Sequence, residues 1–187
     1  MRRTNARTRT LASYRCMPTL ATAPRVRSID PTSYLPLARF SCGGDSDYER
    51  EVDELVGKLH AGDVRCVVLR AAEDPNTDSL IGVCGVSRRP LGYAADAAYI
   101  AVIGISSRWR GYRLLDGGRL GQFLLGDALD QIKAIWGGPP MPTVWAVIAP
   151  ENRASHDTFA YWGFACLGGR GGYDVRYRPS GIGLSAS

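Results

Sequence analysis

A glycine- and arginine-rich loop is the part of this sequence whose residue types could bind an anion. It follows an apolar, β-branched run from Tyr99 to Ile105, which is typical of a strand buried on both faces. It precedes a segment, starting at Leu120, in which apolar residues recur along one helix face. Such a loop aims free N–H groups and the positive helix end at one point, so it predicts a phosphate or pyrophosphate site. A plain strand-to-helix turn is the alternative interpretation. The loop residues concerned are Arg108, Arg110, Arg113, Gly117, Gly118, Arg119 and Gly121.

A second segment, TVWAVIAPENRASHDTFAYWGF at 143–164, predicts another buried strand, a break at Pro150 and a short helix ending at Gly163. Together the two segments resemble the GNAT superfamily of acyl-CoA-dependent N-acyltransferases. In that family a central strand leads into a Q/R-x-x-G-x-G/A loop, and the next strand ends in a stretch like E-N-x-x-A…Y-x-x-x-G-F. The matching letters here are I-G-I-S-S-R-W-R-G, D-G-G-R-L-G-Q-F-L-L and P-E-N-R-A-S-H-D-T-F-A-Y-W-G-F. The resemblance covers roughly residues 25 to 178 in element order and is specific within 98–164.

Three departures from the family pattern bear on function. The loop carries about six extra residues, 112–117, which separate Arg110 from the second half of the motif. Asp116 stands where the family has Gln or Arg, and Arg119 stands where it has Gly. Phe159 occupies the position, seven residues after the motif Asn, where the family usually has Tyr.

The resemblance implies an N-acetyltransferase that moves an acetyl group from acetyl-CoA directly to an amine, without a covalent enzyme intermediate. The acceptor would be a small-molecule or protein amine. Backbone groups of the central strand would hold the pantetheine arm and the thioester oxygen, the glycine loop would hold the pyrophosphate, and Asn152 would meet the pantetheine arm. The residues expected to contact acetyl-CoA are Ile103, Gly104, Ile105, Arg110, Gly117, Gly118, Arg119, Leu120, Gly121, Asn152, Ser155 and Phe159.

Acid and base catalysts are harder to place. A thioester is already activated, so the site must position the amine, remove its proton, stabilise the oxyanion and let the thiolate leave. Phe159 has no proton to give. His156 shares a helix face with Asn152 and Ser155 and is the first candidate donor, and Tyr173 is the second. Candidate bases, acting directly or through water, are Asp96, Tyr99, Glu73 and Asp74.

Two other functions stay open at this point. The replacements at Asp116, Arg119 and Phe159 favour a catalytically weak CoA-binding or interaction module. A basic N-terminus keeps open an acetyltransferase acting on aminoacyl-tRNA, as in the toxin branch of the superfamily. Homodimerisation is also left open.

The flanking pattern indicates which elements position these residues. A strand is expected at Val26–Ile29, a helix start at Asp30-Pro31, and a firmer helix from the Ser46/Glu49 capping box to Gly62. The later elements expected are a strand hairpin (64–71 and 79–86), the strand at 99–105, a helix to Trp136, the strand and helix of 143–163, and two short strands around 168–172. This order predicts an α+β fold, a mostly antiparallel twisted sheet of about six or seven strands with helices on both faces.

Charge divides the chain into three parts. The net charge is +5 over 187 residues, yet residues 1–27 hold seven Arg and no acid, and the remainder is slightly acidic. Residues 1–24 are therefore predicted to be a basic, disordered arm, 25–178 the acyltransferase domain, and 179–187 a flexible tail. The arm would suit a transit peptide, an RNA contact, or an extension preceding a true start at Met17.

Cysteine use and hydropathy exclude several classes of protein. The five Cys are odd in number and contain no C-x-x-C pair, which argues against a disulfide framework and a zinc site; no metal is expected. A reducing compartment, the cytoplasm, follows from this. There is no apolar run of about 18 residues, so no membrane span is expected.

Overall fold

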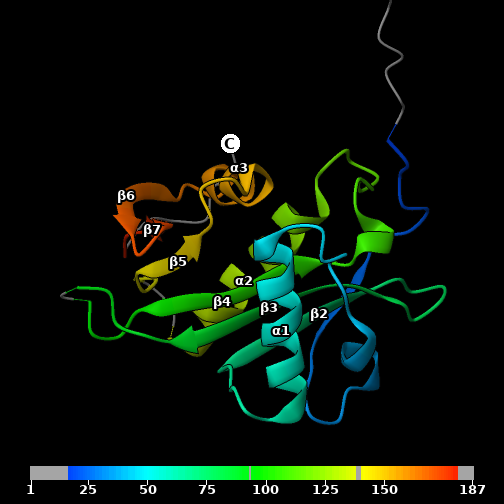
Figure 1. The fold of residues 1–187 in the computed structure, drawn as a ribbon, viewed down its shortest axis with the longest axis horizontal. Helices are drawn as coiled ribbons and strands as arrows, with labels where there is room; N and C mark the ends of the chain where they lie inside the picture. The colour runs from blue at the N-terminus through cyan, green and yellow to red at the C-terminus, as the bar shows by residue number, and fades with distance from the viewer. Residues whose placement is uncertain (1–16, 93, 138–139, 181–187) are drawn as a thin grey trace, which may run out of the picture.

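The computed structural model describes residues 17–92, 94–137 and 140–180, which form one sheet with helices on both faces (Figure 1). The seven strands lie in the order β1-β2-β3-β4-β5-β7-β6. They are β1 (Arg25–Ser28), β2 (Val68–Glu73), β3 (Leu80–Arg88), β4 (Ala98–Ile105), β5 (Val144–Ile148), β6 (Ala165–Arg170) and β7 (Tyr173–Arg178). Only β4 and β5 pair in parallel; the other five neighbouring pairs of this sheet are antiparallel. The predicted α+β fold is confirmed.

Three α-helices and two 3-10 helices occur among the described residues. They are η1 (Leu35–Arg39), α1 (Asp47–Ala61), η2 (Ser107–Trp109), α2 (Leu120–Ile135) and α3 (Arg153–Tyr161). In Figure 1, α1 crosses one face of the sheet over β2, β3 and β4, while α2 lies behind it. Accordingly Val56 and Leu59 of α1 belong to one buried cluster, and Leu125 and Ile132 of α2 belong to another. None of the described helices is both long enough and apolar enough to cross a bilayer.

The α1 boundaries follow from the predicted capping residues. The Ser46 hydroxyl accepts the Glu49 N–H, and the Glu49 carboxylate accepts the Ser46 N–H at 3.1 Å. Gly62 ends the helix with φ of 83°, a left-handed conformation that glycine adopts without strain. Both ends of this helix are thus set by local sequence.

The expected helix at Asp30-Pro31 is wrong. The Asp30 carboxylate instead accepts the N–H and hydroxyl of Thr32, at 3.0 and 2.8 Å, which closes a turn. Regular structure resumes only with the short η1, which contains Pro36. An Asx turn competes with helix initiation because the Asp side chain satisfies the same N–H groups that a helix cap would.

Part of the predicted N-terminal arm belongs to the folded domain. The Leu20 N–H donates to the Arg113 carbonyl, and the Arg113 N–H donates to the Pro18 carbonyl, both at 2.9 Å. The Leu20 side chain is 6% exposed and lies in the cluster under α2. The predicted boundary at residue 24 is therefore too late, and the rest of that prediction, residues 1–16, lies outside the described residues. The basic composition predicted that this segment lacks contacts to offset the entropy lost on ordering it. The buried Leu20 side chain and two backbone hydrogen bonds provide such contacts.

Replacing Leu20 with alanine is expected to lower the free energy of unfolding by about 2–3 kcal/mol, since it leaves a cavity among buried side chains. Urea denaturation followed by circular dichroism measures this. Leu35→Ala is the matched control: Leu35 is 75% exposed, so its removal should cost less than about 0.5 kcal/mol. Equal midpoints for the two variants would show that residues 17–24 contribute nothing to the domain.

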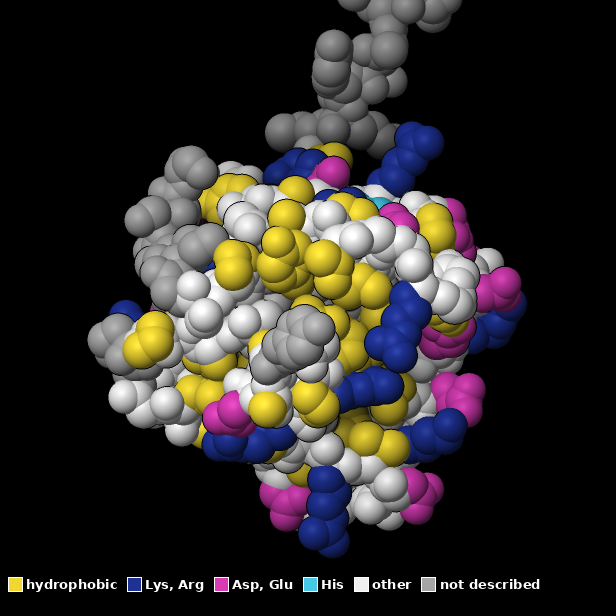
Figure 2. Space-filling model, turned by 90° about the vertical axis from the view of Figure 1, so that its left-hand side faces the viewer, with side chains coloured by type: hydrophobic (Ala, Val, Ile, Leu, Met, Phe, Trp, Pro, Cys, Tyr) yellow, Lys and Arg dark blue, Asp and Glu magenta, His cyan; other side chains and the backbone are white. Residues whose placement is uncertain are grey.

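A third apolar cluster lies where α1 does not cover the sheet. It consists of Ala97, Trp145 and Val175, with Leu91, Ala94, Tyr99 and Tyr177 packed against it. The Arg89 guanidinium stacks over the Tyr99 and Trp145 rings, 5.1 and 5.5 Å from their centroids. Figure 2 shows the end of the molecule nearest β6 and β7, where hydrophobic side chains gather beside several Lys or Arg side chains. The long Arg89 side chain thus covers part of this apolar cluster, as the helices cover other parts of the sheet.

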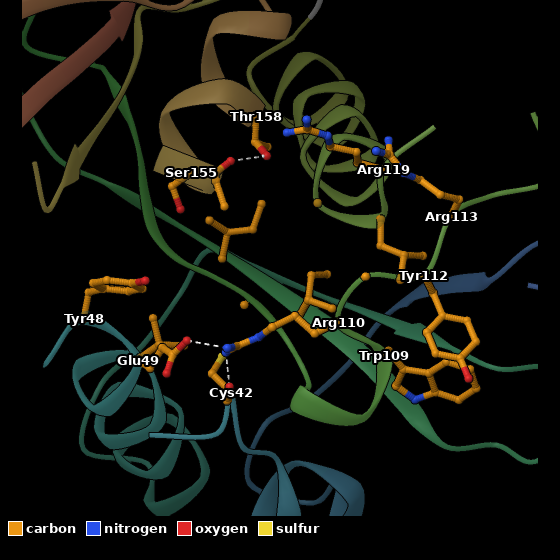
Figure 3. Close-up of a pocket in the computed structure, with 18 of the residues that line it drawn as sticks. Cys42, Tyr48, Glu49, Trp109, Arg110, Tyr112, Arg113, Arg119, Ser155 and Thr158 are labelled. Atoms are coloured by element: carbon orange, nitrogen blue, oxygen red, sulfur yellow. Dashed lines mark hydrogen bonds and ion pairs between the residues drawn. The ribbon is translucent and has the colours of Figure 1, made fainter. Parts of the chain in front are cut away.

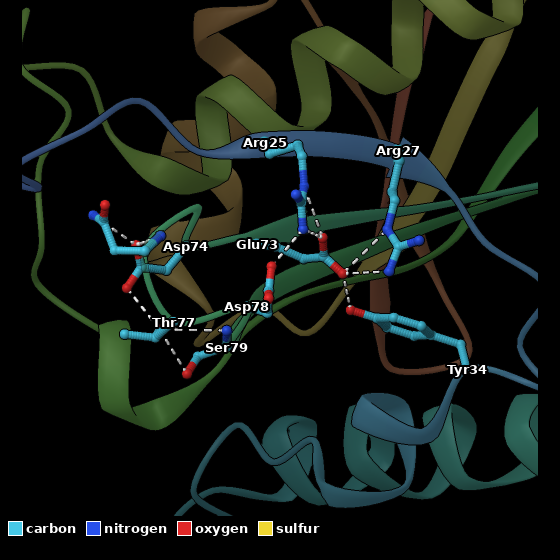
Figure 4. Close-up of polar contacts among 9 residues, drawn as sticks. Arg25, Arg27, Tyr34, Glu73, Asp74, Thr77, Asp78 and Ser79 are labelled. Atoms are coloured by element: carbon cyan, nitrogen blue, oxygen red, sulfur yellow. Dashed lines mark hydrogen bonds and ion pairs between the residues drawn. The ribbon is translucent and has the colours of Figure 1, made fainter.

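The carboxylate of Glu73 joins β1 to β2 (Figure 4). It is 1% exposed, and its two oxygens accept from the guanidinium groups of Arg25 and Arg27 at 2.7 and 2.8 Å and from the Tyr34 hydroxyl. Burial alone would raise the pKa of Glu73, but the hydrogen bonds from Arg27, Tyr34 and Arg25 outweigh it and hold the pKa at about 2. Glu73 is thus a structural ion and not the general base considered above. Asp74, considered with it, accepts from Asn76 and Thr77 within its own turn.

Candidate active site

Strands β4 and β5 diverge at the centre of the sheet. Their parallel pairing stops at Tyr99 and Trp145, while β4 continues to Ile105. In the β3–β4 ladder Gly85 pairs with Val102 and Val86 with Ile100, so residue 101 is an extra residue and forms a bulge. Beyond Tyr99, one edge of β4 therefore has no partner strand among the described residues. Residues 103–105, which the family resemblance implied would hold a ligand, lie on this edge.

A cavity of about 430 Å³ opens where the strands diverge (Figure 3). The lining comes from β4, from the N-terminal ends of α1, α2 and α3, from the loop after β4, and from the N-terminal segment. The residues are Met17, Cys42, Tyr48, Glu49, Val52, Ile103, Gly104, Ile105, Trp109, Arg110, Gly111, Tyr112, Arg113, Arg119, Leu120, Gly121, Ala154, Ser155 and Thr158. Eight of the twelve residues predicted to contact acetyl-CoA are among them: Ile103, Gly104, Ile105, Arg110, Arg119, Leu120, Gly121 and Ser155.

The first turn of α2 supplies amide groups to this cavity. The Gln122 side chain accepts the Arg119 N–H at 3.3 Å. The N–H groups of Leu120 and Gly121 come next, and neither has an acceptor within its own helix. Gly121 is also a point of close approach, because a Cβ there would lie 3.3 Å from the Thr158 hydroxyl oxygen of α3. Free amides at a helix N-terminus, beside a narrow contact between two helices, suit an anion such as a pyrophosphate.

The extra loop residues belong to a small hairpin whose tip, residues 114–118, does not line the cavity. Arg113 and Arg119 form an isolated bridge, and the Leu114 N–H donates to the Gly118 carbonyl at 2.9 Å. The Gly117 N–H donates to the Leu114 carbonyl at 2.9 Å, and the Gly118 N–H to the Asp116 carboxylate at 2.8 Å. The predicted role of Gly117 and Gly118 as phosphate-binding amides is therefore corrected: both N–H groups are used within the hairpin, and neither residue lines the cavity.

The arginines of the loop differ in how they are held. Arg110 crosses the cavity to α1, with its Nη1 2.5 Å from the Glu49 carboxylate and its Nη2 donating to the Cys42 carbonyl. Arg119 pairs with Asp157 of α3 at 3.0 Å, and Arg113 donates to the Gly117 carbonyl at 3.3 Å. In Figure 3 the guanidinium groups of Arg113 and Arg119 lie together, on the α2 side of the cavity. They can add positive charge near the helix end.

Two buried groups between α1 and β4 have shifted pKa values. Burial would raise the pKa of Glu49, but hydrogen bonds from the Ser46 and Asp45 backbone and from Arg110 lower it, so it stays a carboxylate. Burial, with a smaller contribution from the Asp53 charge, raises the pKa of the Cys42 thiol to about 12. Cys42 thus remains a thiol and is a poor nucleophile, in keeping with direct transfer.

The two remaining contact residues of the α3 segment lie outside the cavity. Asn152 is the N-cap of α3, and its side-chain oxygen accepts the Ser155 N–H at 3.0 Å. Phe159 is 1% exposed and packs edge-on against Phe164, with ring centroids 4.9 Å apart. Phe159 is a core residue, so even a tyrosine hydroxyl at this position would have to displace the buried cluster to reach a ligand.

None of the six predicted acid–base candidates, including Tyr99, lines this cavity. His156 Nδ1 accepts from Arg176 Nε at 3.1 Å, and its Nε2 lies 3.6 Å from the Asp174 carboxylate, so the ring joins α3 to β7. Asp96 binds Arg88 at 2.6 Å and Trp136 at 3.2 Å, beside the first residues of β4 and not its cavity end. Tyr173 donates to Glu51 at 2.5 Å and lines a second cavity of about 200 Å³.

For several residues that line the cavity, no pattern in the sequence indicated a place in a functional site. In the sequence Glu49 is recognisable only as half of a capping box, and Tyr48 is the residue before it in the same helix. Cys42 lies in a segment without periodicity. Their position in the cavity depends on how α1 packs against β4, which no local pattern reports. In Figure 3 the hydroxyl groups of Tyr48 and Ser155 both point into the cavity, one from α1 and the other from α3.

No protein-family model matches this sequence, and no curated protein matches it significantly. Solved structures share its fold. Ribosomal-protein-S5-alanine acetyltransferase from Vibrio fischeri is 14% identical, with a TM-score of 0.58 over 88% of this chain and 96% of that one. AtaTR bound with AcCoA is 13% identical, with a TM-score of 0.61 over 84% and 93%. A bacterial toxin is 20% identical, with a TM-score of 0.57 over 84% and 91%.

The chain therefore has the fold of the GNAT acetyltransferases, and the predicted resemblance is confirmed at the level of the fold. The parallel β4–β5 pair that diverges, the cavity at that point and the α2 N-terminus beside it form the candidate site of this chain.

Proposed function

We propose that this protein is an N-acetyltransferase that takes its acetyl group from acetyl-CoA and transfers it directly to an amine. The observation that carries the proposal is the cavity at the divergence of β4 and β5, which combines an unpaired strand edge with the N-terminus of α2. An extended amide-rich arm and a pyrophosphate are the two kinds of group that such an edge and such a helix end would bind. Structures that share the fold include one bound with AcCoA, which supports this choice of donor.

The residues of the cavity divide between binding and chemistry. The amides of Leu120 and Gly121 would hold the pyrophosphate, with Arg113 and Arg119 adding charge. The free edge of β4 at 103–105 would hold the pantetheine arm and orient the thioester carbonyl, whose oxygen gains negative charge as the amine attacks. Because Cys42 stays protonated, the amine and not the protein would be the nucleophile.

A CoA-binding module without turnover is the second candidate. It is favoured by Phe159, which occupies the usual position of the proton donor and is buried in the core. Loss of a general acid lowers the rate about 10²–10⁴-fold. A protein that binds CoA but turns over very slowly is therefore a physically reasonable result of this replacement.

Two measurements on the full chain separate the candidates. Calorimetry with acetyl-CoA alone tests the cavity as a donor site. Release of free CoA is then followed with a panel of small amines, peptides with free N-termini and aminoacyl-tRNA, with the acetylated product identified by its mass. Binding with turnover supports the acetyltransferase, and binding without turnover on any acceptor supports the module. Absence of binding would overturn both candidates.

A further inference from the structure

We propose that Tyr48, from the first turn of α1, donates the proton to the departing CoA thiolate. This inference rests on the proposed acetyl transfer and goes beyond it by assigning the acid to an element other than α3. The position on α3 that matches the family's tyrosine holds Phe159, which lies in the core. If the reaction uses a protein acid, the donor must come from elsewhere in the cavity wall.

Tyr48 lies between two cavities and lines both of them. It lines the 430 Å³ cavity together with Gly104 and Ser155, and it also lines the 200 Å³ cavity together with Glu51 and Tyr173. No other described residue lines both of these cavities. A donor bound in the larger cavity and an acceptor entering through the smaller one would therefore react beside this side chain.

The Tyr48 hydroxyl is also free to act. In Figure 3 it points into the larger cavity, and among the described residues it has no hydrogen-bond partner. Other hydroxyl groups nearby are engaged: Thr158 donates to the Ala154 carbonyl at 2.8 Å, and Tyr173 donates to Glu51. The hydrogen bond to Glu51 raises the pKa of Tyr173, which makes it a weaker acid. Tyr112 also lines the larger cavity, but in Figure 3 its ring points away from Tyr48 and Ser155 and lies beside Trp109. Ser155 is the remaining rival, and a serine hydroxyl is less acidic than a phenol.

The step balances without a further reagent. The amine nitrogen forms a bond to the thioester carbonyl carbon, and as the tetrahedral intermediate collapses the C–S bond breaks with its electron pair on sulfur. The Tyr48 O–H gives its proton to that sulfur and becomes a phenolate. The proton lost from the amine nitrogen reaches solvent, and the phenolate recovers a proton from solvent. The products are the acetylated amine and CoA thiol.

The test begins with Tyr48→Phe in the full chain, assayed with acetyl-CoA and the best amine of the panel. We expect kcat to fall about 100-fold while calorimetric acetyl-CoA affinity changes less than about threefold, because only the proton donor is removed. Tyr161→Phe on the outer side of α3 is the matched control and should keep wild-type kcat. Ser155→Ala tests the rival. A Tyr48→Phe enzyme with wild-type kcat would overturn the proposal, and a large loss only in Ser155→Ala would assign the role to Ser155.

A second measurement separates proton donation from a structural role. Incorporating 3-fluorotyrosine at position 48 keeps the shape and lowers the pKa of the phenol. If Tyr48 must be protonated, the alkaline limb of the kcat–pH profile moves to lower pH; an unmoved profile overturns the assignment even if Tyr48→Phe is slow. Wild-type protein that binds acetyl-CoA but turns over no amine would instead contradict the proposed acetyl transfer, so the two failures are distinguishable.

Discussion

Replacing Gly121 with glutamate is expected to weaken acetyl-CoA binding by about 10³-fold, or roughly 4 kcal/mol. The substitution puts a carboxylate at the first turn of α2, where the free amides would meet the pyrophosphate, so attraction becomes repulsion. It also fills the space between α2 and α3, because a Cβ at this position already lies 3.3 Å from the Thr158 hydroxyl oxygen. Isothermal titration calorimetry measures the affinity, and circular dichroism reports whether the fold is kept.

The same substitution elsewhere in the chain provides the control. Gly57 lies on the exposed side of α1, and a Cβ there would meet no atom within 4 Å. Gly57→Glu adds the same charge to the protein and should leave the affinity within about threefold of wild type. If Gly121→Glu folds and binds acetyl-CoA as tightly as Gly57→Glu does, the pyrophosphate does not lie at α2.

Replacing Glu73 with glutamine is expected to lower the free energy of unfolding by about 2–3 kcal/mol at pH 7. The buried carboxylate accepts from two guanidinium groups and a phenol hydroxyl, and the amide can satisfy only part of this set. Arg25 and Arg27 are half exposed, so water can hydrate them after the change, which limits the loss. Urea denaturation measures it.

The pH dependence of this effect has a definite sign. The pKa of Glu73 is lowered to about 2 in the folded protein, from an ordinary value of 4.5. The unfolded chain therefore takes up this proton first as pH falls. The stabilisation is fully present above about pH 4.5 and is lost progressively between there and pH 2. Across this pH window the free energy of unfolding, measured with urea, should fall more steeply for the wild-type protein than for Glu73→Gln. The values for the two proteins should converge at the acid end of the window.

Asp78→Asn is the control for removing one negative charge that pairs with Arg25 without removing a buried group. Asp78 also pairs with Arg25, but its side chain is 76% exposed, so the pair contributes little and the variant should stay within about 0.5 kcal/mol of wild type. A Glu73→Gln protein as stable as Asp78→Asn, or equally steep pH curves for wild type and Glu73→Gln, would show that the buried carboxylate does not stabilise the β1–β2 pair.

The sequence by itself determined the elements whose signals are local. The capping box at Ser46 and the glycine at Gly62 bound α1, and the apolar stripe after Leu120 defines α2, because helix limits depend on residues within about four positions. The order of elements then determined the mixed sheet and the parallel β4–β5 crossover. The helix start after the glycine loop predicted an anion site at the N-terminus of α2, and the family resemblance implied a ligand-binding strand segment at 103–105. Both segments line the cavity.

Only the tertiary structure decided which side chains line the cavity at the divergence of β4 and β5. Strand β4 was predicted to be buried on both faces, yet its residues alternate between buried and half-buried, and the half-buried Ile103 and Ile105 line the cavity. His156 follows Ser155 on α3, but its ring contacts Arg176 and Asp174 of β7 and does not line the cavity. Tyr48 reaches the cavity from a helix distant in sequence. Which side chains line the cavity depends on where β4 and β5 diverge and on how α1 packs against β4. These are contacts between segments far apart in the chain, and they leave no periodic pattern in the sequence of those segments.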